Sequence, residues 1–429
     1  MERSGEVGMV RGNMKRPEIL APAGDYVCMQ AAIDAGCDAI YFGLDEFNMR
    51  SHSGVNFTLK DLPFIAERCH SNGVKIYLTL NAIIFEGELE KVEEIVKAAK
   101  DYVDAFIVSD WGVIGLCKKY GAEIHISTQM STSNSAAVRF LASQGATRVV
   151  LARECSLGEV KKIAENTGVE IECFVHGAQC LAMSGRCLLS HEAYGKSACR
   201  GECRQPCRRR FVVKAVDLYE DKDGKPVHES DTSFVVGAHT LLSAKDLCSL
   251  RFVDELMDAS IASFKIEGRA RNADYVRTTV KCYRRAVDAV MAGSYTEELK
   301  DELVAEVEKV FHREFSHGMF YGRPGVNQLT DSENSLAKSV KRHIGIVIDY
   351  FIKAGIAQIK IQDHSIEIGD TIQIHGSTTG VKELKVEAMR RDEEIVTKAE
   401  RGTWVTLKAP RCRVGDKVFY IETRDLKDK

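Results

Sequence analysis

Cysteine is the residue type whose number and spacing in this chain point most directly to chemistry. The sequence holds 14 cysteines, and one segment carries Cys173, Cys180, Cys187, Cys199, Cys203 and Cys207. A cytosolic compartment keeps thiols reduced, so such a cluster indicates a metal or redox site more readily than a disulfide framework.

The spacings in this segment are C-x6-C from Cys180 to Cys187 and C-x3-C from Cys203 to Cys207. Four thiolates that converge on one point can hold an iron–sulfur cubane or a tetrahedral zinc ion, because both need soft anionic sulfur. Zinc ribbons usually contain C-x2-C knuckles and radical-SAM loops contain C-x3-C-x2-C, and neither pattern occurs here. Spacing therefore leaves an iron–sulfur cluster, a structural zinc ion and uncoordinated thiols all open.

The elements that position these cysteines begin near residue 18, where short apolar runs alternate with amphipathic stretches. Buried strands that are each followed by a helix indicate parallel βα units. Seven strands are predicted before the Cys-rich segment: Glu18–Pro22, Ala39–Gly43, Lys75–Leu80, Ala105–Val108, Ile124–Thr128, Arg148–Ala152 and Glu170–Val175. The predicted helices between them include Tyr26–Ala35, Leu59–Ser71, Leu89–Lys100 and Leu157–Asn166.

An eighth strand, Ser263–Ile266, follows only after a long interruption, and a helix is predicted over Asn272–Ala292. Eight βα units over residues 18–292 fit the roughly 250 residues of a (β/α)8 TIM-like barrel. The Cys-rich segment, residues 176–260, is then an insertion between strands seven and eight on the catalytic face. An open doubly wound sheet is the rival fold, but no GxGxxG follows the first strand.

The remaining chain divides into further predicted regions. A charged helix is expected over Glu297–Val310 and a connecting segment over Phe311–Ser339, which places the barrel domain at residues 17–335. Alternating runs over 344–422 predict a small antiparallel β-barrel, so a C-terminal domain is expected over residues 340–429. Residues 1–16 are expected to be a flexible N-terminal extension, because translation can start at Met14.

Composition limits the class of protein. The chain has 429 residues, 45% of them hydrophobic and 28% charged, with a formal charge of -3, which excludes disordered and collagen-like proteins. No apolar run reaches the roughly 20 residues that cross a bilayer, and the polar start is unlike a signal peptide. We therefore expect a cytoplasmic protein without a membrane partner, in which any nucleic acid is held by a local basic patch.

Several sequence blocks resemble one bacterial family. They include FVHGAQCLAMSGRCLLS, GECRQPCR, SAKDLCSL and FKIEGRARNADYV, together with EILAPAGDYVCMQAAIDAGCDAIYFGL and NMRSHSGVNFT near the start. From about Pro17 onward the chain resembles the collagenase-like peptidase family of unassigned catalytic type. That family includes tRNA 5-hydroxyuridine and rRNA hydroxycytidine hydroxylation proteins and relatives that hydroxylate ubiquinone without oxygen. The appended β domain makes the chain most similar to the tRNA hydroxylation branch.

The resemblance implies an iron–sulfur cluster, 4Fe-4S in type, with prephenate as a co-substrate, tRNA or alternatively rRNA as partner, and an electron donor that the sequence does not identify. Carried over by motif, Cys180 and Cys187 match the first ligand pair, and Cys203 and Cys207 match the second. Cys248 is a reserve for the fourth ligand. Cys199 departs from the family, which more often has Asn at this position.

Polar side chains stand at or after the predicted strand ends, where a barrel places its catalytic pocket. We expect Arg153, His176, Glu267 and Arg269 to be catalytic, and Arg50, Asn81, Gln129 and Lys265 to bind substrate; Glu154 lies in the same region. Arginines suit a dicarboxylate such as prephenate because they form bidentate pairs. Each residue can instead belong to a structural hydrogen-bond layer, and His176 can equally fix a loop.

A dense basic run surrounds the last two cysteines and consists of Arg200, Arg204, Arg208, Arg209 and Arg210. These arginines can grip RNA phosphates, and Arg208 and Arg209 are assigned to substrate binding on that ground. They can equally neutralise an anionic four-thiolate cluster or form solvated ion pairs.

The leading hypothesis is a tRNA hydroxylation protein that forms 5-hydroxyuridine at the wobble position. The family label makes a peptidase the alternative, but His191-Glu192 is followed by Ala-Tyr-Gly, so there is no HExxH, and no GxSxG occurs. A zinc-stabilised RNA-binding module without catalysis is the third hypothesis.

Overall fold

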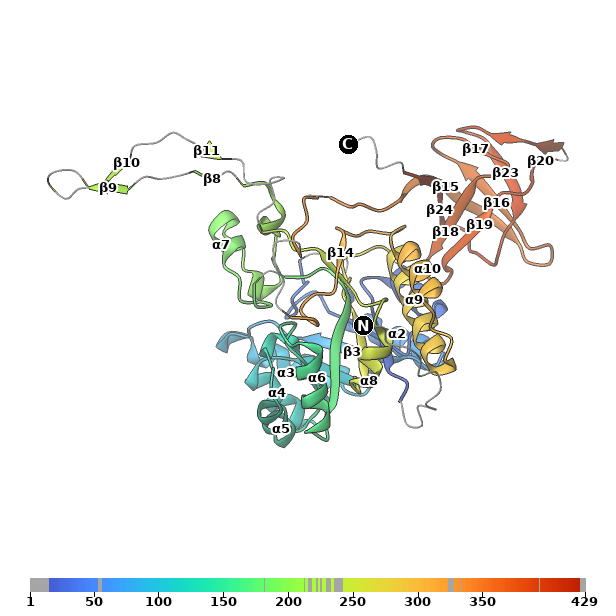
Figure 1. Cartoon of the computed structure of the whole chain (residues 1–429). Helices are drawn as coiled ribbons and strands as arrows, with labels where there is room; N and C mark the ends of the chain where they lie inside the picture. Colours follow the sequence, from blue (N-terminus) through green and yellow to red (C-terminus); the bar gives the residue numbers. More distant parts are fainter. Residues whose placement is uncertain are drawn as a thin grey trace.

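The computed structural model describes most of the chain (Figure 1). The described residues are 15–424, apart from 53–55, 181, 212, 215–217, 221–222, 224–225, 229–232, 235–241, 323–327, 333 and 393. The predicted N-terminal extension therefore lies almost wholly outside them, except for its end, where Arg16 pairs with Asp288 at 2.6 Å. Within the described part of the chain, no helix is long and apolar enough to cross a membrane.

Eight parallel strands close into the predicted barrel. Each strand pairs in parallel with the next, and the last one pairs with both the first and the seventh, which completes the ring. The strands are β1 (Glu18–Pro22), β2 (Ala39–Phe42), β3 (Lys75–Leu80), β4 (Ala105–Val108), β5 (Ile124–Ile126), β6 (Ala146–Val150), β7 (Glu170–Gly177) and β13 (Ser263–Ile266). The TIM-like fold class is confirmed, and the doubly wound alternative is excluded.

Helices cover the outside of the ring and alternate with its strands. They are α1 (Tyr26–Asp34), α2 (Leu62–His70), α3 (Leu89–Ala99), α4 (Trp111–Lys119), α5 (Ser135–Ser143), α6 (Leu157–Glu165), α8 (Val253–Asp258), α9 (Ala273–Ala292) and α10 (Glu297–Val307). Several begin at a side chain that accepts a bond from the first turn, as Asp25 does from Cys28 N at 2.7 Å. In α6 the cap is a reciprocal box between Ser156 and Glu159.

Three predicted strands end early: the second at Phe42, the sixth at Val150 and, with a consequence for the site, the fifth. The run Ile124–Thr128 was expected to be extended, but β5 stops at Ile126 and a 3-10 turn, η3 (Thr128–Met130), follows. The Ser127 hydroxyl accepts a bond from Gln129 N at 3.3 Å, which favours the turn over the strand. Gln129 therefore lies in a turn above the barrel and not at a strand end.

The insertion between β7 and β13 contains mostly short elements. Its Cys-rich part holds α7 (Leu189–Tyr194), η4 (Ala198–Arg200) and η5 (Pro206–Arg208). It continues into an arm of paired strands, β8 (Val213–Lys214), β9 (Leu218–Glu220), β10 (Pro226–His228) and β11 (Ser233–Phe234), which extends away from the barrel (Figure 1).

The insertion returns to the barrel through β12 (Asp246–Cys248), which pairs antiparallel with β7. A short strand in the predicted connecting segment, β14 (Phe315–Ser316), pairs parallel with β12. Leu247 of β12 and Val253 and Leu256 of α8 are buried in the barrel core. The end of the predicted insertion is therefore packed as part of the barrel.

The C-terminal region is antiparallel, as predicted. Its main sheet has the strand order β19-β18-β24-β15-β16-β23-β20-β21, and β17 pairs with β22 beside it. Ile359, Ile372 and Val418 belong to a core separate from that of the barrel. The strands are β15 (Ser339–Phe351), β16 (Ile356–Ile361), β17 (Ile366–Glu367), β18 (Thr371–Gly376), β19 (Gly380–Lys385), β20 (Met389–Arg391), β21 (Glu394–Val396), β22 (Lys398–Ala399), β23 (Trp404–Lys408) and β24 (Lys417–Thr423).

Ionic side chains fill part of the barrel interior. Glu172 of β7 is fully buried and accepts a bond from Lys265 of β13 at 2.7 Å, and Arg148 of β6 lies 3.4 Å from the same carboxylate. Arg148 also pairs with Glu18 of β1 at 2.5 Å. Burial by itself raises the pKa of Glu172, but the charges of Lys265 and Arg148 outweigh it and lower that pKa. The interior is thus held by a charge-balanced network.

This network predicts that Lys265 is needed for stability. Lys265→Met leaves the buried Glu172 with one distant partner, and removal of one member of a buried pair costs about 3 kcal/mol of unfolding free energy. Lys161→Met is the matched control, because Lys161 pairs with Asp258 at the same 2.7 Å but both side chains are exposed, so water screens the pair and its loss should change the free energy of unfolding far less. Urea unfolding measures both values, and equal losses would contradict a structural role for Lys265.

Candidate functional site

A carboxylate and three arginines meet at the barrel mouth. Glu267 follows β13 directly and accepts a bond from Arg50 Nη2 at 3.1 Å. Burial by itself raises the pKa of Glu267, but the positive charges of Arg50, Arg153 and Arg269 outweigh it and lower that pKa. We call Arg50, Arg153 and Arg269 the mouth arginines. Because three cations face one carboxylate, this part of the mouth has an excess of positive charge.

Arg269 is held rigidly within this group. Its Nη1 donates to Thr79 Oγ1 at 3.1 Å, and its Nη2 donates to Asn48 Oδ1 at 2.8 Å. Burial lowers its pKa to about 10. Because these bonds join the loop after β13 to the loop after β2 and to β3, they hold the guanidinium across the mouth. Arg269 is therefore oriented by two partners that sequence reasoning did not anticipate.

Arg153 follows β6 and points toward the loop after β7. Its Nη1 donates to Ala178 O at 3.0 Å, and its guanidinium lies 4.3 Å from the ring centre of Phe174. Its buried Nε has no hydrogen-bond partner among the described residues. A buried donor without a partner is costly, so Arg153 retains hydrogen-bonding capacity that the described residues do not use.

Asn81 and Gln129 belong to the rim of the mouth. Asn81 Nδ2 donates to Ser127 Oγ at 3.1 Å, and its Oδ1 accepts a weaker bond from Met49 N at 3.3 Å. The Gln129 side chain packs directly against Gly185, which lies between Cys180 and Cys187. The Cys-rich loop therefore sits against the rim.

A second contact fixes the other half of this loop. Gly201, which precedes Cys203, packs against Asn48 and Ser51 after β2 so closely that a Cβ would lie 2.5 Å from the Asn48 carbonyl oxygen. Its φ of +86° is also a left-handed value that glycine adopts readily. The Cys-rich loop is thus attached to the barrel mouth at two glycines.

The four cysteines assigned by motif lie in one electrostatic environment. Cys180 is exposed, and Cys187, Cys203 and Cys207 are half-buried. The pKa of Cys207 is raised first by burial, is lowered by Arg208, and is raised again by the charges of Cys180, Cys203 and Cys187. Electrostatic coupling of this kind places the other three cysteines in the neighbourhood of Cys207.

The four cysteines could hold either a tetrahedral zinc ion or an iron–sulfur cubane, and the two groups need different sulfur separations. Among the described residues, no group of three or more His, Cys, Asp or Glu side chains is close enough to hold one metal ion. A tetrahedral zinc with bonds of about 2.3 Å needs its four sulfurs almost in contact. A cubane holds its thiolates farther apart, because each one binds a different iron atom. The positions of the described cysteines therefore do not choose between a cluster and a zinc ion.

Two other cysteines make contacts of their own. Cys248, the reserve ligand, is buried on β12 beside Tyr283, and burial raises the pKa of its thiol to about 12. The Cys199 thiol donates to the Gly185 carbonyl oxygen and so connects the two halves of the loop. The quartet with Cys207 as fourth member is thus the better-supported set.

His176 and Lys265 are not part of the mouth group. His176 is buried among the rings of Tyr275, Tyr283 and Phe315, and burial lowers its pKa to about 3, so the imidazole is neutral. Lys265 is engaged with Glu172 inside the barrel. This placement supports structural roles for both, in contrast to the expected catalytic and substrate-binding roles.

The arginines of the basic run differ in burial: some are buried or half-buried and others are exposed. Arg208 is buried and donates to Ser243 Oγ at 2.9 Å and Gln179 O at 2.8 Å, so it ties the insertion together. Arg200 pairs with Glu88 at 2.5 Å. Arg204, Arg209 and Arg210 are exposed. Arg208 is therefore a poor candidate for RNA contact, whereas Arg209 keeps that assignment.

Sequence reasoning missed two residues near the site. Asn48 is fully buried, and its Oδ1 accepts hydrogen bonds from the Arg269 side chain and from Arg50 N. The sequence signal that could have identified Asn48 was its position two residues before Arg50. Arg313 comes from the predicted connecting segment and donates to Gln205 Oε1 at 3.5 Å, close enough to Cys207 for their charges to interact. Nothing in the spacing of that segment pointed to the cysteine loop.

The fold and the site define a class of protein: a TIM-like barrel whose mouth is covered by a cysteine-bearing loop. The model of peptidase family U32 matches residues 24–330. The chain therefore belongs to peptidase family U32, and the resemblance found in its sequence blocks is confirmed.

Named relatives differ in what they are said to do. The chain is 40% identical to an uncharacterized protease of Methanocaldococcus jannaschii, over 94% of this chain and 98% of that protein. It is 38% identical to a collagenase of Porphyromonas gingivalis, over 96% of this chain and 100% of that protein. It is 33% identical to tRNA hydroxylation protein P1 of Bacillus subtilis, over 84% of each.

The loop attachment predicts different effects at two glycines of the insertion. Gly201→Ala forces the loop off the Asn48 carbonyl oxygen, whereas Gly195→Ala, at φ +63°, meets nothing within 4 Å. Both substitutions place a Cβ on a left-handed backbone, which costs about 1–2 kcal/mol, so the contact with Asn48 and Ser51 is the main difference between them. We expect limited trypsin digestion to cleave the insertion about tenfold faster in Gly201→Ala than in Gly195→Ala. Equal cleavage rates would show that the loop is not fixed at this point.

Proposed function

We propose that this protein is an RNA-modifying hydroxylase that forms 5-hydroxyuridine at the wobble position of tRNA without molecular oxygen. The observation that carries the proposal is the position of Arg50, which links the mouth to the cysteine loop. Its guanidinium bonds to Glu267, and its pKa is raised first by that carboxylate and further by the charge of Cys203. A redox group held by the cysteines would therefore stand directly over the barrel mouth.

Cys180, Cys187, Cys203 and Cys207 are the residues that would hold a 4Fe-4S cluster. Such a cluster supplies electron transfer when it is bound. The cysteine thiols must be thiolates to serve as ligands, and the positive charge of Arg208 lowers the pKa of Cys207 against the effect of burial. The electron donor remains to be identified.

The mouth arginines would bind prephenate. A dicarboxylate brings two negative charges, which the three cations around Glu267 can neutralise through bidentate contacts. Arg153 contributes its unpartnered Nε, and Arg269 is already oriented by Thr79 and Asn48. The pyrimidine must leave its stack to reach this pocket, as in other enzymes that modify bases.

A peptidase remains the second candidate because the collagenase and protease relatives match nearly the whole chain. A histidine that served as the acid or base in hydrolysis would have to take up a proton. His176 is poorly suited, because its pKa of about 3 keeps it neutral and it is packed among aromatic rings. Hydroxylation of rRNA or of another substrate is a further alternative within the same chemistry.

Mass spectrometry of tRNA and rRNA nucleosides from a deletion strain tests the proposal. We expect 5-hydroxyuridine in tRNA to disappear, to return with the wild-type gene, and to stay absent with Cys203→Ala. Cys199→Asn is the matched control, since this cysteine lies in the same loop but outside the quartet. Full tRNA modification in the deletion strain, or a loss confined to rRNA, would contradict the tRNA assignment, and collagen cleavage by purified protein would support the peptidase alternative.

A second test separates the exposed arginines from the buried one. Arg204→Gln combined with Arg209→Gln removes two exposed charges beside the cysteines, so we expect tRNA affinity to fall about tenfold in low salt and iron content to be unchanged. Arg208→Gln, which removes buried bonds to Ser243 and Gln179, should instead lower the melting temperature and the iron content. Fluorescence anisotropy and metal analysis measure these effects. Unchanged affinity in the first variant would exclude these arginines from RNA binding.

A further inference from the structure

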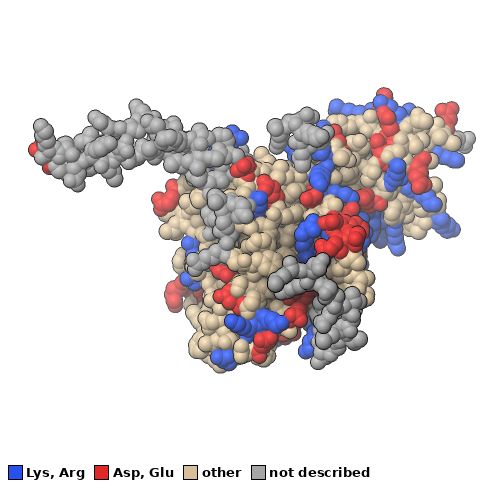
Figure 2. Space-filling model, in the orientation of Figure 1, with Lys and Arg blue, Asp and Glu red and all other residues tan. Residues whose placement is uncertain are grey.

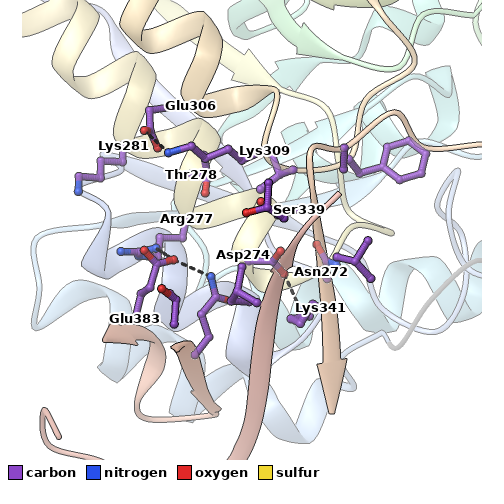
Figure 3. Close-up of a pocket in the computed structure, with 18 of the residues that line it drawn as sticks. Asn272, Asp274, Arg277, Thr278, Lys281, Glu306, Lys309, Ser339, Lys341 and Glu383 are labelled. Atoms are coloured by element: carbon purple, nitrogen blue, oxygen red, sulfur yellow. Dashed lines mark hydrogen bonds and ion pairs between the residues drawn. The ribbon is translucent and has the colours of Figure 1, made fainter. Parts of the chain in front are cut away.

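A large cleft separates the barrel helices from the C-terminal sheet (Figure 3). It has a volume of about 780 Å³ and is lined by α9, α10 and the C-terminal strands β15, β18, β19 and β24. One lining residue, Asn272, is the residue before α9 and follows Arg269 of the mouth arginines by three positions in the chain. The cleft runs along the join between the barrel helices and the C-terminal sheet.

The lining is rich in cations and hydroxyl groups. Its basic residues are Arg277, Lys281, Arg285, Lys309, Lys341 and Arg424, and only four acidic residues line the same space. Thr278, Ser335 and Ser339 add hydroxyl donors. The whole chain is slightly acidic at -3, so this excess of positive charge is local. Figure 2 shows basic and acidic side chains interspersed where the barrel meets the C-terminal sheet.

Some of these cations form the walls of the cleft. Lys341 of β15 pairs with Asp274 of α9 at 2.6 Å, and Arg277 reaches Glu383 of β19 at 3.8 Å (Figure 3). These two ion pairs cross from the barrel to the sheet, so they hold the walls at a fixed separation.

Other cations are available to a ligand. Lys281 is exposed and makes no hydrogen bond or ion pair among the described residues. Arg424 donates one bond, from Nη1 to Ser335 O at 3.3 Å, and has further donors to offer. An open, polar groove with free cations differs from the enclosed and mostly apolar pockets that bind compact metabolites.

We propose that this cleft binds the sugar–phosphate backbone of the RNA substrate beside the nucleotide that enters the barrel mouth. The inference rests on the proposed function and adds to it a second RNA contact, built jointly by α9 and the C-terminal sheet. Phosphate groups match the spaced cations, and ribose hydroxyls match the threonine and serine side chains. The C-terminal domain thereby acts as one wall of the RNA site.

The test compares two double variants of the full chain that remove the same charge. Lys281→Gln with Arg424→Gln changes the cleft. Lys118→Gln with Arg139→Gln is the matched control, since Lys118 is exposed at the end of α4 and Arg139 also donates one bond to a backbone carbonyl, at 3.0 Å from Asn166 O. Fluorescence anisotropy with an unmodified tRNA transcript, from 50 to 200 mM salt, measures affinity and its salt dependence.

We expect the cleft variant to bind tRNA about tenfold more weakly and the control within twofold of wild type. Loss of two phosphate contacts should also flatten the slope of log K against log salt by roughly 1.5, a change that loss of folding would not produce. Lys281→Gln alone removes an exposed side chain and should give about a threefold loss, which keeps the test valid if the double variant is unstable.

Three results would overturn the inference. If the cleft variant and the control bind tRNA equally, the cleft is not an RNA contact, while the proposed function stands. If the cleft variant loses affinity for free uridine monophosphate as strongly as for tRNA, the cleft is a small-molecule site. If the wild-type protein does not bind tRNA and the deletion strain keeps its 5-hydroxyuridine, the proposed function fails as well.

Discussion

The pairing of β13 with both β1 and β7 is the constraint on which the rest of the structure depends. It closes the ring, so the carboxyl ends of all eight strands meet at one mouth. The insertion leaves the barrel after β7, and the close contacts of Gly185 and Gly201 attach its Cys-rich part to the rim of the mouth.

Charge is distributed unequally along the barrel axis. Inside, Glu18 and Glu172 balance Arg148 and Lys265, as expected where water cannot screen a lone charge. At the mouth, three arginines face a single carboxylate, Glu267, and Arg153 keeps one buried donor without a partner among the described residues. Balanced charge supports the fold, whereas the unbalanced charge at the mouth is suited to an anionic ligand.

The sequence predicted the barrel well because its strands are mostly apolar, and β1, β3, β4 and β13 begin and end at the expected residues. Side-chain direction was harder to predict. His176 and Lys265 were placed correctly on their strands, yet one faces aromatic rings and the other the ionic interior. The buried position of Arg208 also escaped prediction, because its partners Ser243 and Gln179 lie far from it in sequence.

The central claim is that four thiols above the barrel mouth hold an iron–sulfur cluster, and metal analysis of anaerobically purified protein tests it most directly. The account predicts iron and acid-labile sulfide in equal amounts, together with the brown colour of thiolate-bound iron. Colourless protein that carries one zinc ion per chain and no sulfide would contradict it.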